Sequence, residues 1–116
     1  MVLLAAMGLA MTMQAADYYR VVGVSTVLGS NWNTGDANND MTETSSGTYT
    51  LVKKGVSLTS GTNYEYKIIK NGAYSNGQWP LKGNASFSVN STGLYDVTFT
   101  FSPSGSGSYS AKATRV

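Results

Sequence analysis

Aromatic rings and a lysine gather around one short segment of the chain, residues 64–70. Its alternating pattern predicts a β-strand that carries Lys67, and an Asn-Gly turn follows the strand. Two further rings, Tyr74 and Trp79, come soon after that turn. An indole or phenol face can bury the C–H face of a sugar ring, while an ammonium group reaches the hydroxyls at its edge. This combination of side chains indicates stacking on a sugar.

Side chains for catalysis and metal binding are scarce. The chain has no cysteine and no histidine, so thiolates and imidazoles are not available as nucleophiles, bases or ligands. A glycosidase needs two carboxylates at a fixed separation, and no spacing singles out a pair among the six acidic residues. The calcium-like run Asp36–Asp40 lacks the glycine and the final glutamate of a calcium loop, which favours a turn held by local hydrogen bonds. We therefore predict no enzyme, no metal site and no cofactor.

Composition limits the class of protein further. The 116 residues are enough for one domain, and the charged fraction of 12% is about half of that usual for soluble domains. Neutral polar residues take the place of charges, as in many secreted all-β modules. The formal charge of +2 comes from scattered lysines and arginines that form no basic stripe. Binding to nucleic acid is therefore not expected.

The first sixteen residues differ from the rest of the chain. They are apolar and uncharged, and small residues at Ala15 and Ala16 offer a cleavage site. The apolar run has the length expected in a signal peptide and is too short to span a bilayer. We predict a signal peptide over residues 1–16 and a domain over residues 17–116, with a structured N-terminal helix as the alternative. The mature protein is then secreted, periplasmic or on the cell surface, with no cysteine for a lipid anchor.

From residue 17 onward, short alternating segments are separated by turn signals. The segment 64–70 has Tyr64, Tyr66 and Ile68 on one face and Glu65, Lys67 and Ile69 on the other. Long loops are expected at residues 30–46 and 71–84, and no amphipathic helix is evident. The expected strands are 18–24, 47–53, 56–58, 64–70, 86–89, 94–101 and 109–114. This pattern predicts an all-β fold, an antiparallel β-sandwich of about six to eight strands.

Six pieces of the chain, taken in order, carry a resemblance to a known family. They are Leu28–Asn33, Asn39–Thr42, Gly47–Leu51, Gly61–Lys70, Phe87–Val89 and Gly93–Phe101. Their order resembles that of starch-binding immunoglobulin-like modules of bacterial pullulanases, amylases and SusE/SusF-type surface glycan-binding proteins. Glycogen-binding domains of AMP-activated kinases are more distant relatives. The resemblance implies an immunoglobulin-like sandwich that binds polysaccharide, with α-glucan favoured, and partners from a glycan-utilisation system.

The resemblance also implies a set of binding residues. In such modules the glycan rests on two rings flanked by a lysine and amide side chains. Trp32 matches the first ring, Lys67 matches the lysine, and Asn84 falls at an asparagine position. Tyr74 falls where the second ring is expected, and Trp79 supplies an additional ring five residues later. Either Trp79 has taken over the second stacking role or both rings contribute.

A second function class remains open on the sequence alone. The chain can also be a structural or adhesion β-sandwich of a bacterial surface protein, in which the rings only pack. Trp32 would then cap an open end of the sandwich, and Lys67 would be a solvated side chain. The exposure and alignment of the rings distinguish the two classes.

Overall fold

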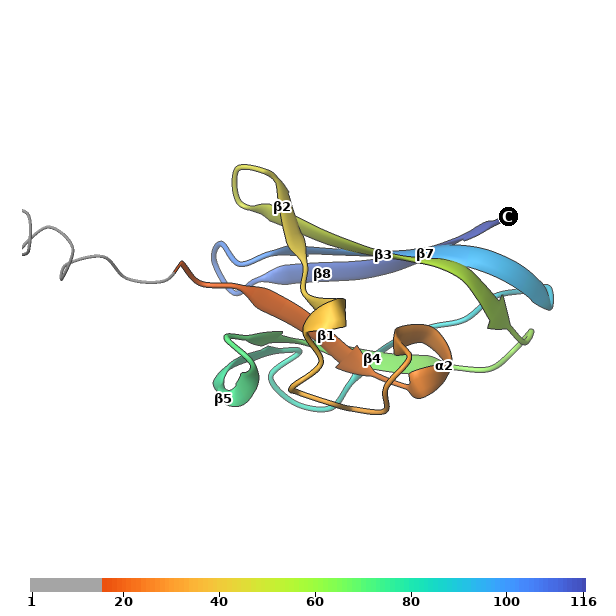
Figure 1. Cartoon of the computed structure of the whole chain (residues 1–116), viewed down its shortest axis with the longest axis horizontal. Coiled ribbons are helices and arrows are strands. Elements are labelled where there is room, and N and C mark those ends of the chain that lie inside the picture. The colour runs from red at the N-terminus through yellow and green to blue at the C-terminus, as the bar shows by residue number, and fades with distance from the viewer. Residues whose placement is uncertain (1–15) are drawn as a thin grey trace, which may run out of the picture.

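Two antiparallel sheets of four strands each face one another in the computed structural model, which describes residues 16–116 (Figure 1). The first sheet contains β1 (Tyr19–Gly23), β4 (Tyr64–Lys70), β5 (Ala73–Trp79) and β6 (Ala85–Phe87). The second sheet contains β2 (Thr42–Ser45), β3 (Thr48–Leu58), β7 (Gly93–Ser102) and β8 (Ser108–Arg115). This confirms the predicted fold class, an all-β, immunoglobulin-like antiparallel β-sandwich. Apart from Ala16, the predicted signal peptide lies outside the described residues.

Strand β4 is the centre of the first sheet. It pairs with β1 along one edge, and on its other edge it pairs with both β5 and β6. Strand β6 lies opposite Tyr64–Tyr66 and β5 lies opposite Ile68–Lys70, so these two strands share one edge end to end. The chain that joins them, residues 80–84, leaves the sheet.

The second sheet has the order β2-β3-β7-β8. The pairing of β3 with β7 shifts register between Lys53 and Val56, where Gly55 has a φ of 62°. The Gly55 N–H donates to the Asp96 carboxylate across this bulge at 3.0 Å. The two strands predicted at 47–53 and 56–58 are therefore one strand, interrupted by a bulge that glycine accommodates.

The core lies between the sheets and follows the alternation read from the sequence. On both β4 and β7, every second side chain is buried, and these side chains form the inward sets of the two strands. Their rings meet edge to face, with the centroids of Tyr66 and Phe99 4.9 Å apart. Burial of each such side chain stabilises the fold by about 1.5–3 kcal/mol. The inward sets are Tyr64, Tyr66 and Ile68 from β4 and Tyr95, Val97, Phe99 and Phe101 from β7.

Four elements were not expected from the sequence. The short helix α2 (Ser25–Leu28) follows β1, and the region predicted as a loop at 30–46 contains the 3₁₀ helix η1 (Ala37–Asn39) and strand β2. The region 71–84, predicted to be irregular, contains β5. Strands β2 and β5 have no clean alternation of apolar residues, and they form because each pairs with an edge that is otherwise open. Within residues 16–116, no helix has the length and apolar character needed to cross a membrane.

Candidate functional site

The outer face of the first sheet, turned away from the sandwich interior, is covered by chain. Alternation places Val22 of β1 and Lys67 and Ile69 of β4 on this face, yet all three are buried. The cover is the connection between β1 and β2, residues 29–40, which folds back along the sheet (Figure 1). We call this segment the covering loop. Two apolar residues on the outer face are thereby removed from water.

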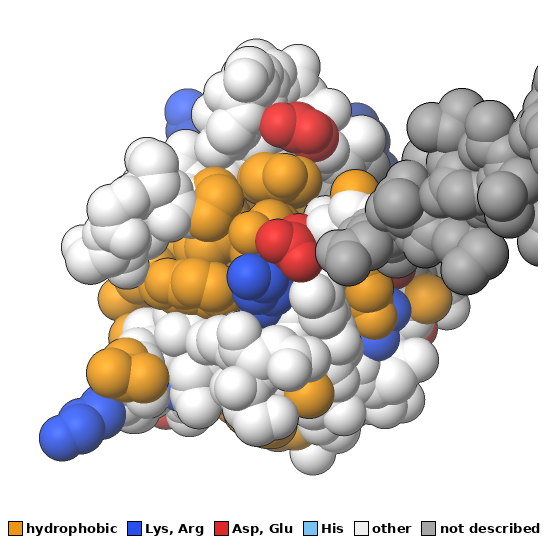
Figure 2. Space-filling view, turned by 90° about the vertical axis from the view of Figure 1, so that its left-hand side faces the viewer, with side chains coloured by type: hydrophobic (Ala, Val, Ile, Leu, Met, Phe, Trp, Pro, Cys, Tyr) orange, Lys and Arg blue, Asp and Glu red, His pale blue; other side chains and the backbone are white. Residues whose placement is uncertain are grey.

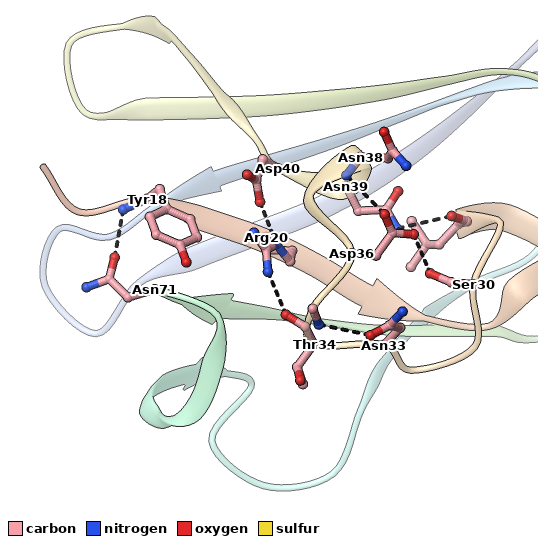
Figure 3. Close-up of polar contacts among 12 residues, drawn as sticks. Tyr18, Arg20, Ser30, Asn33, Thr34, Asp36, Asn38, Asn39, Asp40 and Asn71 are labelled. Atoms are coloured by element: carbon pink, nitrogen blue, oxygen red, sulfur yellow. Dashed lines mark hydrogen bonds and ion pairs between the residues drawn. The ribbon is translucent and has the colours of Figure 1, made fainter. Parts of the chain in front are cut away.

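Arg20 fastens the covering loop to β1 (Figure 3). Its Nη1 donates to the carbonyl oxygen of Thr34 at 2.6 Å, and its Nε pairs with the Asp40 carboxylate at 2.5 Å. The guanidinium also lies over the Tyr18 ring, 5.3 Å from its centroid. The hydrogen bond to Asp40 raises the pKa of Arg20. Since Thr34 and Asp40 lie in the middle and at the end of the loop, one side chain holds both.

A second set of hydrogen bonds centres on Asp36 (Figure 3). Its carboxylate accepts from the Ser30 hydroxyl at 2.6 Å and from the backbone N–H of Asn38 at 3.0 Å. The Ser30 hydrogen bond is the main reason that the pKa of Asp36 is lowered. Asn39 is buried and accepts from Lys53 Nζ of β3 at 2.9 Å. The calcium-like run is thus a turn held by side-chain hydrogen bonds, as the sequence predicts.

Trp32 lies in the covering loop with an unusual backbone. Its φ is 51°, in the left-handed region, where a bulky side chain costs about 1–2 kcal/mol. The backbone N–H of Trp32 donates to the carbonyl oxygen of Gly23 at 2.7 Å, and this hydrogen bond holds the residue beside the end of β1. The indole is half-buried and belongs neither to the core cluster nor to the ring pairs of the described residues. The fold therefore holds this ring outside the core.

Lys67 is only 6% exposed, so the alternative expectation of a solvated side chain is wrong. Its Nζ donates to the carbonyl oxygen of Gly83 at 2.8 Å, and burial lowers the pKa of the amine. The covering loop and residues 80–84 crowd this face, which a strand pattern alone does not reveal. Lys67 thus holds residues 80–84 against the sheet.

Asn84 is exposed and lies next to that contact. Its amide donates to the Glu65 carboxylate at 3.1 Å. Glu65 and Lys67 flank Tyr66, whose partner in β1 is Gly23, the residue that accepts from Trp32. The structure therefore brings Trp32, Lys67 and Asn84 to the same end of the outer face.

Tyr74 lies on the same face but at the other end. Ala73 pairs with Lys70, which faces the opposite side of the sheet from Lys67, so alternation turns Tyr74 to the outer face. The ring is 36% exposed, and partial burial raises the pKa of its hydroxyl. Along β4, Lys70 lies about 13 Å from the position of Tyr66. Tyr74 and Trp32 thus flank the outer face from two ends.

Trp79 does not share this face. It pairs with Ile68, so its side chain turns toward the sandwich interior. The indole packs on Phe101 and Tyr19, at centroid distances of 4.7 and 6.0 Å. Its Nε1 lies against the backbone of Gly107. A side chain at position 107 would clash with the indole, because its Cβ would lie only 2.4 Å from Nε1. The five predicted site residues therefore divide into four on the outer face and Trp79 on the inner one.

Sequence reasoning predicted the turn at Asp36–Asp40, but it did not identify Arg20, which fastens the covering loop to β1. One signal was present. Arg20 is a lone charge within a run of strand formers, at a position that alternates with the apolar Tyr19 and Val21. A charge in such a run needs a partner nearby, but the sequence does not say which of many polar loop residues it is.

A comparison with known protein families identifies the family of this chain. Residues 7–99 match the family model described as Starch binding domain, which covers most of the chain and ends within β7. None of the curated proteins matches the chain significantly. The family expected from the sequence is confirmed, and it is one of non-catalytic modules that bind polysaccharide. The chain therefore belongs to the starch-binding domain family.

Proposed function

We propose that this module binds α-glucan on the outer face of the first sheet. The glycan stacks on Trp32 at one end and Tyr74 at the other, and it hydrogen-bonds with Asn84 between the strand and the covering loop. The observation that carries the proposal is the placement of Trp32. A strained left-handed backbone holds its ring outside the core, and such strain persists where the surrounding structure enforces it for a purpose.

The charges on this face support a neutral ligand. The Lys67 amine donates to the carbonyl oxygen of Gly83, and the Glu65 carboxylate accepts from the Asn84 amide. Arg20 forms an ion pair with Asp40. Each of these charges already has a partner within the protein. A ligand that brings hydroxyl groups and no charge is therefore favoured over an anionic or cationic one.

Lys67 acts as a positioning residue in this proposal. Its buried amine fixes residues 80–84, and with them the exposed amide of Asn84. An ammonium group has three donors, and the contact with Gly83 uses one of them. The remaining two donors leave Lys67 able to contact a sugar hydroxyl directly while it still holds Gly83.

The rigidity of the face affects its affinity. Because Arg20 and Asp36 already fix the covering loop, little conformational entropy is lost when a glycan binds. Stacking on an open surface leaves much of the sugar in water, however. We expect dissociation constants roughly in the micromolar to millimolar range. The separation of the two rings favours an oligosaccharide over a single sugar.

Electrophoresis in gels loaded with amylose, pullulan or glycogen tests this function. We expect all three glucans to retard the protein and Trp32→Ala to abolish the retardation. Val52→Ala, which removes an exposed apolar side chain from β3, is the matched control and should migrate as the wild type does. If no glucan retards the wild-type protein, the structural or adhesion role is the correct one.

Export is a separate part of the proposal. We expect residues 1–16 to be removed and the domain to reach the periplasm, the cell surface or the medium, where it acts with other proteins of a glycan-utilisation system. Expression of the full chain in a bacterial host, followed by N-terminal sequencing of the exported protein, checks this. A mature protein that begins within a residue of Asp17 supports export, and an intact N-terminus on intracellular protein contradicts it.

A further inference from the structure

Strand β8 is an edge strand of the second sheet with one side open. It pairs with β7 along one side, and no strand among residues 16–116 pairs with the other side. Its eight residues pair with β7 without a register shift. At the opposite edge of the sheet, β2 has only four residues, and its pairing shifts between Glu43 and Ser45. A regular edge with a row of unpaired N–H and C=O groups is a template for another strand.

The sequence of β8 has few of the features that usually keep edge strands apart. Such features are prolines, bulges and charged side chains. β8 contains no proline and no bulge, and its first three inward residues are Tyr109, Ala111 and Ala113. The fourth, Arg115, lies at the end of the strand over a tyrosine ring. The one charge in the middle of the strand is Lys112 on the outer face of the sheet, and it limits the register in which a second strand can pair.

A second copy of β8 can pair with this edge in a defined register. In an antiparallel pair about a twofold axis, side chains that face each other lie on the same side of the sheet, so a residue lies on the axis. Only the registers with Ala111 or Lys112 on the axis pair all but one residue of Ser108–Arg115. The register on Lys112 sets two ammonium groups against each other, which is destabilising. The register on Ala111 places Lys112 opposite Ser110 of the second copy instead.

Size as well as charge favours the register with Ala111 on the axis. Tyr109 then faces Ala113 of the second copy, on the side of the sheet that points into the sandwich. A hollow of about 320 Å³ lies beside Ala113, with Phe87 and Tyr95 in its walls. Figure 2 shows apolar side chains between the two layers at the end of the molecule where β8 begins, and Tyr109 in this strand is 38% exposed. The exposed ring of each copy thus meets a small residue and a hollow in the other.

We propose that two copies of the chain associate through β8, with Ala111 on the twofold axis, and that their second sheets join into one continuous sheet. The axis is perpendicular to this sheet, so both first sheets lie on the same side of it. The outer faces of both copies therefore point in the same direction. This consequence rests on the proposed function, because two glycan sites that face one way can bind one glucan surface together and raise the apparent affinity.

Single-cysteine variants test the register, because the chain has no cysteine of its own. Residues that face each other in antiparallel strands have Cα atoms about 4.5–5.5 Å apart, which a disulfide can bridge. We expect Ala111→Cys to form a covalent dimer under mild oxidation, seen on a non-reducing gel. Ala113→Cys faces Tyr109 of the second copy and is the matched control, which should remain largely monomeric.

Charge changes at Ser110 test the contact from the outer face of the sheet, where this residue is exposed. In the proposed register, Ser110→Glu places a carboxylate opposite Lys112 of the second copy, and the symmetry repeats the pair. Sedimentation velocity should show a dissociation constant lowered roughly fivefold for Ser110→Glu and raised by a similar factor for Ser110→Lys. Thr44→Glu, on the exposed edge strand β2, should leave it unchanged. Urea unfolding of each variant confirms that it is folded.

The dimer is contradicted if the wild-type protein sediments as a monomer at concentrations up to about 1 mM. It is also contradicted if Ala113→Cys crosslinks as readily as Ala111→Cys, or if Ser110→Glu and Ser110→Lys have the same effect, because association then uses another surface. Glucan-loaded gels keep this result separate from the proposed function. A monomeric protein that glucan still retards contradicts the dimer alone, and a dimer that no glucan retards contradicts the glycan-binding function alone.

Discussion

The two tryptophans of this protein lie on opposite faces of the same sheet and are held by different forces. Trp32 is held through its backbone, by a loop that Arg20 and Asp36 fasten with hydrogen bonds. Trp79 is held through its ring, by packing on Tyr19 and Phe101. A ring held by its backbone can be lost without disturbing the core. A ring held by its neighbours cannot, and it contributes to stability whatever else it does.

The largest expected effect separates the two rings by stability. Trp79→Ala removes a half-buried indole from two aromatic neighbours, and we expect a loss of about 3 kcal/mol in the free energy of unfolding. Trp32→Ala should cost less than about 1 kcal/mol, because the ring lies outside the core. Urea unfolding followed by circular dichroism measures both. Equal losses would show that the two rings contribute to stability in the same way.

A third variant sharpens this comparison at Trp32. Glycine adopts a φ of 51° without strain, whereas alanine does not. Trp32→Gly should therefore be at least as stable as Trp32→Ala, despite the greater freedom that glycine gives the unfolded chain. A Trp32→Gly protein that is much less stable than Trp32→Ala would argue against the left-handed conformation.

The next effect concerns the fastening of the covering loop. Arg20→Ala leaves the Thr34 carbonyl and the Asp40 carboxylate without their shared donor, and we expect a loss of about 2 kcal/mol in stability. Glycan affinity should fall as well, since the loop carries Trp32. Arg20→Lys should recover part of each, because a lysine can reach only one of the two acceptors at a time. If glycan retardation is unchanged in Arg20→Ala, the loop does not depend on this clamp.

The smallest effect is a dependence on acid. The hydrogen bond from Ser30 holds the pKa of Asp36 below its ordinary value, so the folded state binds the proton less readily than the unfolded state. This stability is present above the unfolded pKa near 4 and is lost as pH falls through the folded pKa. Asp36→Asn should flatten the decline of the urea midpoint as the pH falls below about 4.

Asp17 provides the control for that measurement. The hydrogen bond from Asn71 lowers its pKa too, but it lies outside the covering loop. Asp17→Asn should also flatten the acid decline, yet glycan retardation in acid should be altered only by Asp36→Asn. If both variants alter retardation alike, Asp36 has no special link to the ring.

Alternation made much of the sandwich predictable. The bounds of β4 agree with the predicted segment, and those of β7 differ from the predicted 94–101 by one residue at each end, because both strands alternate over their whole length. Strand β5 was missed since its sequence has no such period, and a register shift separates Lys70 from Ile69 in its pairing. For the same reason, the sequence did not predict which face of the sheet the side chain of Trp79 points to.

The outer face illustrates a different limit. The pattern correctly put Lys67 on the face opposite the core side chains, but a strand pattern describes only one sheet. Whether that face meets water depends on chain far away in sequence, here the covering loop and residues 80–84. These segments are polar and irregular, so the spacing of their apolar residues does not predict that they fold back onto the outer face. Burial of Lys67 was therefore beyond what the sequence conveys.

Because β5 and β6 meet the same edge of β4, residues 80–84 make an excursion that begins and ends on one strand. The length of this segment therefore does not affect how the strands of the sandwich pair with one another. Residues inserted or deleted there would change how far this segment extends from the sheet while leaving both layers intact. The surface beside the outer face can therefore vary in shape through this one segment, without any change in the packing between the two sheets.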